Sequence, residues 1–236
     1  MQNILTISNL SQIYKNNKSQ IKALNCINLN IVNPGIYGLI GHNGAGKSTL
    51  LKCIMGLILP HFGTIQIFGN SNLKALDMLG YMPENFEIHE FMTGREFIEF
   101  VAALRNIQKN NLEIAINKLD KILSLPNLNQ MIHTYSKGNK EKLLFLVSLM
   151  HYPKVLILDE PFTGLDPQTI YSCKKFILNY ASLGNTIILS THILEMVKDL
   201  CTRVIIINKG EIKKHINILK ENNLEQIYLD VVGDKK

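Results

Sequence analysis

The stretch GHNGAGKST, residues 41–49, decides the fold expected of this chain. It fits the pattern G-x-x-x-x-G-K-[ST] and lies between an apolar, strand-like run at 36–40 and a run with helical spacing at 48–59. Its glycines let the backbone curl so that successive amides face an anion, and the N-terminus of the following helix adds its own amides and dipole. The stretch therefore predicts a phosphate-binding loop inside a strand–loop–helix unit.

This loop supplies most of the residues expected to contact a nucleotide. Lys47 adds a mobile positive charge, and Ser48 offers a hydroxyl to Mg²⁺. A chance glycine-rich turn is the alternative, but it does not account for both flanks. The residues assigned to nucleotide binding here are Gly41, His42, Asn43, Gly44, Ala45, Gly46, Lys47, Ser48 and Thr49.

A second acidic motif, VLILDE at residues 155–160, places two carboxylates at the end of an apolar strand. Ligands of open α/β sheets bind at this carboxyl edge. We expect Asp159 to hold Mg²⁺, directly or through water, and Glu160 to orient or deprotonate a water near the γ-phosphate. An acidic strand end that caps the next segment is the alternative, and the loop at 41–49 argues against it.

The order of apolar patterns predicts an α/β fold with a P-loop NTPase core. Alternating strands and helices between residues 155 and 208 indicate a mainly parallel sheet. Runs at 4–10 and 23–32 predict an N-terminal antiparallel β subdomain, and the helical pattern between 93 and 151 predicts an inserted helical subdomain. Other strands are expected over 36–40, 61–68, 155–158, 186–190, 203–208 and 226–232; helices are expected over 48–59, 95–104, 112–123, 140–150, 168–181 and 193–200.

Composition narrows the functional classes. The hydrophobic fraction is 46%, and the longest apolar runs fall short of the roughly 20 residues that span a bilayer. No secretory signal follows Met1, so we expect a cytoplasmic protein. The net charge of +6 favours acidic partners, yet no cluster of Lys and Arg is interleaved with aromatics, and direct nucleic-acid binding is not expected.

The cysteines and histidines predict neither a metal site nor a disulfide framework. The four cysteines show no C-x-x-C spacing, and the seven histidines show no ligand spacing. We expect buried free thiols at Cys26, Cys53, Cys173 and Cys201.

Taken together, the order of motifs resembles the ATP-binding subunit of an ATP-binding cassette (ABC) transporter over residues 5–212. Besides the two motifs above, YSKGN at 135–139 occupies the signature position of that family, and TGLD at 163–166 resembles its D-loop. STH at 190–192 resembles the segment with the switch histidine, and Tyr14 lies where the family stacks an aromatic ring on adenine.

The resemblance implies a role for each of these segments. Ser136, Lys137 and Gly138 would contact the γ-phosphate of an ATP held by the other subunit, and the start of the helix after Ser136 suits an anion. Asp166 would make a contact across the dimer, and His192 would sense the γ-phosphate.

Each of these residues also has a plainer interpretation. Ser136 could be an ordinary N-cap and His192 could cap the helix that follows it. Tyr14 could be a sheet-packing aromatic, and Asp166 could be a turn residue.

Two segments depart from the family pattern. Glu84, in GYMPEN at 80–85, stands where glutamine is usual; its oxygens can bind Mg²⁺, but an ionised carboxylate cannot donate to an attacking water. A solvated loop carboxylate is the alternative. The signature has Tyr135, Lys137 and Asn139 where Leu, Gly and Gln are usual. The Tyr-Ser-Lys-Gly form resembles the branch that energises export permeases, so export is expected.

These implications combine into one expected function. The chain would be a Mg²⁺-dependent ATPase in which two copies, or one copy and a homologous subunit, sandwich two ATP molecules. Glu160 would be the general base, Lys47 would stabilise charge and His192 would sense the γ-phosphate. A separate transmembrane permease would hold the subunit on the cytoplasmic face of the cell membrane. A soluble ABC-type ATPase without a permease and a non-hydrolysing, ATP-dependent regulator are the alternatives.

The resemblance also sets the expected domain organisation. Residues 1–236 would form one ATP-binding domain, with a RecA-like core and its antiparallel part at 1–92 and 152–214. Residues 93–151 would form the helical subdomain, and residues 215–236 a C-terminal extension to which no role is assigned.

Overall fold

The structure, a computed structural model, describes residues 3–16, 19–84, 91–218 and 223–233. Its central sheet has six strands, and all neighbouring pairs are parallel except β10 and β9. In spatial order the strands are β10 (Glu211–Asn217), β9 (Arg203–Asn208), β3 (Gly35–Ile40), β8 (Thr186–Ser190), β7 (Val155–Asp159) and β6 (Leu79–Met82). The inner strands are almost wholly buried, as expected of a parallel sheet covered on both faces.

A second, antiparallel sheet of four strands packs beside the central one. Its strands in spatial order are β2 (Ser19–Ile31), β1 (Leu5–Asn16), β4 (Phe62–Ile67) and β5 (Asn70–Ser71). A 3₁₀ helix, η1 (Asn72–Met78), leads from this sheet to β6 in the central sheet.

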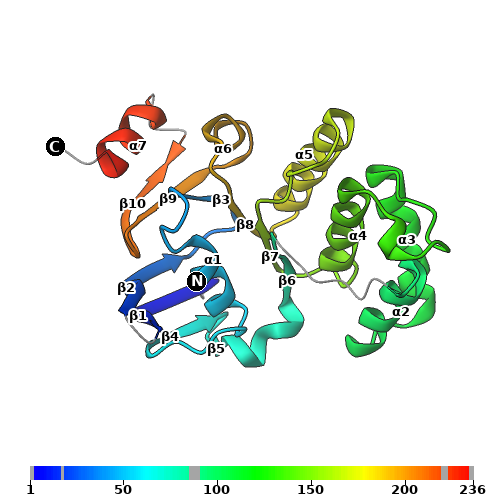
Figure 1. The fold of residues 1–236 in the computed structure, drawn as a ribbon, viewed down its shortest axis with the longest axis horizontal. Coiled ribbons are helices and arrows are strands. Elements are labelled where there is room, and N and C mark those ends of the chain that lie inside the picture. Colours follow the sequence, from blue (N-terminus) through cyan, green and yellow to red (C-terminus); the bar gives the residue numbers. More distant parts are fainter. Residues whose placement is uncertain (1–2, 17–18, 85–90, 219–222, 234–236) are drawn as a thin grey trace.

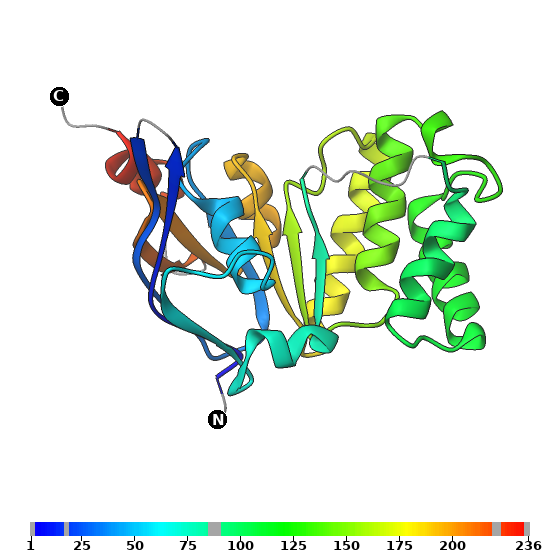
Figure 2. The same cartoon turned by 60° about the horizontal axis from the view of Figure 1, so that its bottom comes forward.

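The helices divide into two groups. Figures 1 and 2 both show α2, α3 and α4 gathered at one end of the molecule and β1 and β2 at the other. This helical lobe comprises α2 (Gly94–Leu104), α3 (Lys109–Leu123), the 3₁₀ turn η2 (Ile132–Thr134) and α4 (Lys137–Leu149). The remaining helices are α1 (Lys47–Ile54), α5 (Pro167–Ser182), α6 (Leu194–Leu200) and α7 (Leu224–Val232).

Two hydrophobic cores cover the two faces of the central sheet. Leu156 and Leu158 of β7 belong to the core shared with the helical lobe, α5 and α6. Ile157, between them, faces the core formed with α1 and the antiparallel sheet. Side chains of a strand alternate between faces, so β7 is apolar throughout and carries its first acid only where the sheet ends. Among the described residues, no helix is long and apolar enough to cross a bilayer.

The α/β fold class is confirmed, with a mainly parallel sheet, an antiparallel sheet and a helical lobe. The predicted strand at 226–232 is wrong, because this segment is helix α7. Asn223 caps that helix by accepting from the Gln226 amide, and the helix buries Leu224 and packs Ile227 against the core.

Three smaller expectations also need correction. The helix expected to run to residue 59 ends at Ile54, because the chain turns through Gly56 at a φ of 71°. Strands β6 and β10 lie in segments to which no strand was assigned. Cys26 is exposed, contrary to the expected buried thiol, while the other three cysteines are buried.

Candidate active site

The phosphate-binding loop connects β3 to α1 at the carboxyl edge of the central sheet (Figure 1). Gly46 is the N-cap of α1 at a φ of 109°, and no side chain caps the helix. A Cβ at Gly46 would lie 2.6 Å from the Ala23 carbonyl oxygen, so only glycine fits here. The first amides of α1 are therefore left to an anion in the loop.

Lys47 folds back over this loop. Its ammonium donates to the Gly41 carbonyl at 2.8 Å and to the His42 carbonyl at 3.3 Å. Only 7% of the residue is exposed. In the part of the chain that the structure describes, the partners of this buried positive charge are neutral carbonyls, and a bound phosphate would supply a counter-ion.

The acids at the end of β7 are held by β8 and the residues after it. Asp159 is buried and accepts a hydrogen bond from the Ser190 hydroxyl. The Glu160 amide donates to the Ser190 carbonyl at 3.2 Å, and Glu160 has a φ of 50°, which is costly for a side chain of this kind. The Glu160 Oε1 atom lies 3.0 Å from Nδ1 of His192.

One pocket of about 600 Å³ brings these groups together. The residues assigned from sequence that line it are Asn43, Gly44, Gly46, Lys47, Ser48, Thr49, Glu84, Asp159, Glu160 and His192. Amides and an ammonium therefore face carboxylates and an imidazole across one space, which is the arrangement that phosphoryl transfer requires.

The donor set of this pocket fits Mg²⁺. Ser48, Asp159 and Glu84 offer hydroxyl and carboxylate oxygens, which are the ligands that Mg²⁺ prefers. Within the described ranges, no group of three or more His, Cys, Asp or Glu side chains could hold a metal. A site of this kind suits an ion that relies on substrate phosphates for the rest of its coordination and does not suit an all-protein cage.

Several lining residues were not predicted from the sequence. Ile21, Lys22 and Ala23 reach the pocket because β2 pairs with β1 and passes beside the loop, and Lys209 follows β9. Their positions depend on strand register, which no local motif reveals.

Tyr14, expected at the adenine, is placed at the rim. Its hydroxyl lies 3.5 Å from the Thr49 hydroxyl and the residue is 42% exposed. It pairs with Ile21 across β1 and β2, and Ile21 lines the pocket. An exposed ring beside the loop is available for stacking on a base.

The signature residues do not line the pocket of their own chain. Ser136 is the N-cap of α4 and accepts from the Asn139 amide at 3.3 Å. The neighbouring Lys137 side chain packs across Gly164 of the segment TGLD. The structure thus brings the signature beside the D-loop. The signature lies outside the nucleotide pocket, whereas Thr163, the first residue of the D-loop, lines it.

Asp166 starts α5. Its carboxylate accepts from the Thr169 amide at 2.9 Å and from the Thr169 hydroxyl at 2.6 Å. These hydrogen bonds lower the pKa of Asp166. Asp166 thus caps α5 through contacts within its own chain, a role that the sequence did not suggest.

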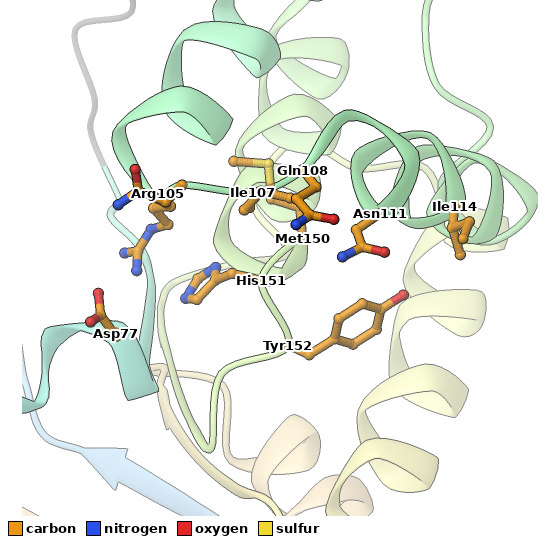
Figure 3. A pocket seen from close by; sticks show the side chains of 10 residues that line it. Asp77, Arg105, Ile107, Gln108, Asn111, Ile114, Met150, His151 and Tyr152 are labelled. Carbon is orange, nitrogen blue, oxygen red and sulfur yellow. The ribbon is translucent and has the colours of Figure 1, made fainter.

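A second cavity, of about 650 Å³, lies between the helical lobe and the core (Figure 3). Asp77 and Arg105 lie near one another at one end of it, and the His151 ring lies beside both. The His151 Nε2 atom donates to the Leu79 carbonyl at 2.9 Å, and burial lowers the pKa of His151 to about 4, with the Arg105 charge adding to the shift. None of the residues assigned from sequence lines this cavity.

Comparison with known proteins gives consistent results. Residues 24–163 match the protein family described as ABC transporter. A Bacillus subtilis (strain 168) protein, "Uncharacterized ABC transporter ATP-binding protein YdbJ", is 37% identical over 220 residues, covering 89% of this chain and 70% of the relative. "Bacitracin transport ATP-binding protein BcrA" of Bacillus licheniformis is 33% identical over 244 residues, covering 100% of this chain and 78% of the relative.

A solved structure shares the architecture. "Structure of ATP binding subunit of ABC transporter" superimposes with a TM-score of 0.82 at 29% identity, covering 91% of this chain and 90% of the other. Such agreement over nearly the whole length supports a cassette fold.

Proposed function

The chain belongs to the ABC transporter family, and from this premise we propose that it is the subunit that binds and hydrolyses ATP to power a separate membrane permease. One observation carries the proposal: the phosphate loop, Lys47, Asp159, Glu160 and His192 line the same pocket. The loop amides and Lys47 bind the phosphates, and the tyrosine at the rim, Tyr14, stacks on the base.

The hydrolytic step depends on the acids at the edge of the sheet. Ser48, Asp159 and Glu84 would hold Mg²⁺, which would neutralise charge on the phosphates. Glu160 takes a proton from the attacking water, and His192 donates a hydrogen bond to the γ-phosphate. The 3.0 Å contact between Glu160 and His192 supports a shared task for the two residues.

The signature requires a second subunit. Ser136, Lys137 and Gly138 stand at the N-terminus of α4, outside the pocket of their own chain. A second copy, or a homologous ATPase subunit, would present these residues to the nucleotide and complete the site. We also propose that Asp166 makes a contact across this dimer, in addition to capping α5.

The partner in the membrane is a permease, and export is the proposed direction. Relatives carry names that include ABC transporter ATP-binding protein and bacitracin transport ATP-binding protein. The Tyr-Ser-Lys-Gly signature at 135–138 supports export. The chain would attach to the membrane through the permease. We also propose that the helical subdomain comprises residues 93–151, the core residues 1–92 and 152–214, and the C-terminal extension residues 215–236.

Phosphate release from Mg²⁺-ATP tests the proposal. Wild-type protein should turn over, whereas Glu160→Gln should bind ATP, hydrolyse it at least about 100-fold more slowly and accumulate as a dimer. Glu195→Gln, an exposed acid on α6, is the matched control and should behave as wild type. No phosphate release by wild type, despite ATP binding, would favour a non-hydrolysing regulator.

Purification from membranes tests the link to transport. A tagged full-length chain should bring a polytopic membrane protein with it, and ATP turnover should change when the two are reconstituted together. An active ATPase that brings no membrane protein would favour the soluble alternative.

A further inference from the structure

The Tyr81 hydroxyl is buried without a hydrogen-bond partner. Among the described residues, only Tyr81 Oη and His151 Nδ1 are buried side-chain polar atoms in this condition. Such atoms are rare because a hydroxyl that leaves water without a new partner raises the free energy of the folded state. An unpaired hydroxyl in a packed position therefore calls for a partner that another state of the protein supplies.

The strand register places Tyr81 beside the acids of the active site. Tyr81 on β6 pairs with Ile157 on the parallel strand β7, and Asp159 lies two residues further along β7. Alternate residues of a strand face the same side, so the three side chains project from the same face of the sheet. Tyr81 packs there against the core that includes residues of α1, the helix that begins at the phosphate loop.

Electrostatics also link Tyr81 to the site. Burial raises the pKa of Tyr81 above its usual range, and the negative charges of Asp159 and Glu84 raise it further. The hydroxyl thus stays protonated and remains a donor. Two carboxylates, both lining the nucleotide pocket, are close enough to affect it.

The Asp159 carboxylate can serve as the acceptor for this hydroxyl. The described contacts of the Asp159 carboxylate use Oδ1, which accepts from Ser190. Its Oδ2 atom can accept from another donor or bind a cation. Tyr81 itself does not line the pocket, so it can act on the nucleotide only through its neighbours.

We infer that Tyr81 is a positioning residue of the proposed magnesium–phosphate site: its hydroxyl would donate to the Asp159 carboxylate, close to Glu84, when these two acids hold metal and nucleotide. This inference rests on the proposed function. The hydroxyl has no hydrogen-bond partner among the described residues. Its hydrogen bond to Asp159 would stabilise the positions that the carboxylates take when metal and nucleotide are bound. The other unpaired atom, Nδ1 of His151, belongs to a residue that lines the second cavity and not the nucleotide pocket.

The test compares Tyr81→Phe with Tyr180→Phe in the full chain, each in a Glu160→Gln background that slows turnover. Both changes remove one buried hydroxyl, but the Tyr180 hydroxyl donates to the Pro153 carbonyl at 2.6 Å. Without nucleotide, Tyr81→Phe should leave the Tm equal or raised, because no hydrogen bond is lost, whereas Tyr180→Phe should lower it.

Nucleotide affinity gives the decisive readout. By calorimetry, Tyr81→Phe should bind ATP in the presence of Mg²⁺ about tenfold more weakly, equivalent to about 1.4 kcal/mol, and bind metal-free ATP in EDTA as the parent does. Tyr180→Phe should change neither affinity. A purely structural role for Tyr81 would not produce an effect that depends on Mg²⁺.

Three results would overturn the inference. One is an unchanged affinity for Mg²⁺-ATP in Tyr81→Phe, and another is an equal loss with and without Mg²⁺. The third is a Tm that falls as far as in Tyr180→Phe, since the hydroxyl would then already be paired. If the parent protein itself fails to bind Mg²⁺-ATP, the proposed function fails as well, and this result is distinct from the other three.

Discussion

The Nδ1 atom of His192 lies 3.0 Å from the Oε1 atom of Glu160, although the two residues are 32 positions apart. The Glu160 side chain is 11% exposed and the His192 side chain is 61% exposed. The imidazole thus covers a nearly buried carboxylate and keeps its other edge open to solvent at the pocket. This contact fixes the orientation of both groups before a nucleotide binds, which is what electrostatic preorganisation requires.

Loss of the imidazole should impair turnover and spare binding. In His192→Ala, Glu160 loses the group that orients it and the γ-phosphate loses a donor, so we expect kcat to fall about 100-fold. The affinity for Mg²⁺-ATP should change little, because the loop and Lys47 remain. Phosphate release and calorimetry measure the two quantities.

The neighbouring Ile193→Ala is the matched control for this change. Ile193 is 42% exposed and should be dispensable for hydrolysis. Wild-type turnover in His192→Ala would remove this residue from the proposed mechanism.

Lys47 should matter chiefly for binding. Its ammonium is held over the loop by the Gly41 and His42 carbonyls, where a phosphate can pair with it. We expect Lys47→Ala to weaken ATP binding by at least about tenfold, since a charge-assisted hydrogen bond is lost. Lys52→Ala, an exposed lysine later on α1, is the control and should retain affinity. Equal affinities in both variants would contradict the role of Lys47.

Local sequence predicted the fold class and one side of the candidate site. The residues from 41 to 49 form a continuous segment, so their pattern alone identifies the loop. Ile21, Lys22 and Ala23 could not be found in this way, because long-range strand pairing carries them to the pocket.

The error at residues 226–232 has a similar cause. Ile227, Tyr228, Val231 and Val232 are residues common in strands, so local preference favoured one. The segment is helical because α7 packs against the core and buries Leu224. Tertiary contacts override a weak local preference, and no pattern inside the segment reports them.

The contact between the signature and the D-loop predicts a selective defect. A Cβ at Gly138 would lie 2.7 Å from the Gly164 carbonyl oxygen, so Gly138→Ala must push the two segments apart. ATP binding by one chain should persist, because Gly138 and Gly164 do not line the pocket, although Thr163 of the D-loop does. ATP-dependent dimerisation and turnover should fall by at least about tenfold if, as we propose, the displaced segments face the second subunit.

Gly184→Ala provides the control for this glycine change. Gly184 has a φ of 88°, and a Cβ there would meet no atom within 4 Å. Backbone strain should reduce its stability by about 1 kcal/mol without affecting ATP-dependent dimerisation, which size-exclusion chromatography can measure. A Gly138→Ala protein that dimerises like wild type would contradict the arrangement proposed for the signature.

A buried acid in the signature helix predicts a pH-dependent change in stability. Glu141 on α4 is 6% exposed. Burial raises its pKa from 4.5 to about 7, the Lys137 charge opposes the shift and the Glu84 charge adds to it. A folded-state pKa above the unfolded value means that this carboxyl contributes its full stability below pH 4.5 and loses it as the pH rises toward 7.

Glu141→Gln should therefore raise stability in a pH-dependent way. Glutamine carries no charge to bury, so the variant should exceed wild type by about 2 kcal/mol at pH 8 and match it near pH 4.5. Glu113→Gln is a control of opposite sign, because Arg95 lowers the pKa of Glu113 and the variant should lose stability at pH 8. Urea unfolding at both pH values measures the difference in free energy of unfolding between each variant and wild type. The titration of groups that all the proteins share cancels from this difference. A Glu141→Gln gain that is the same at both pH values would show that the cost of Glu141 does not come from burying its charge.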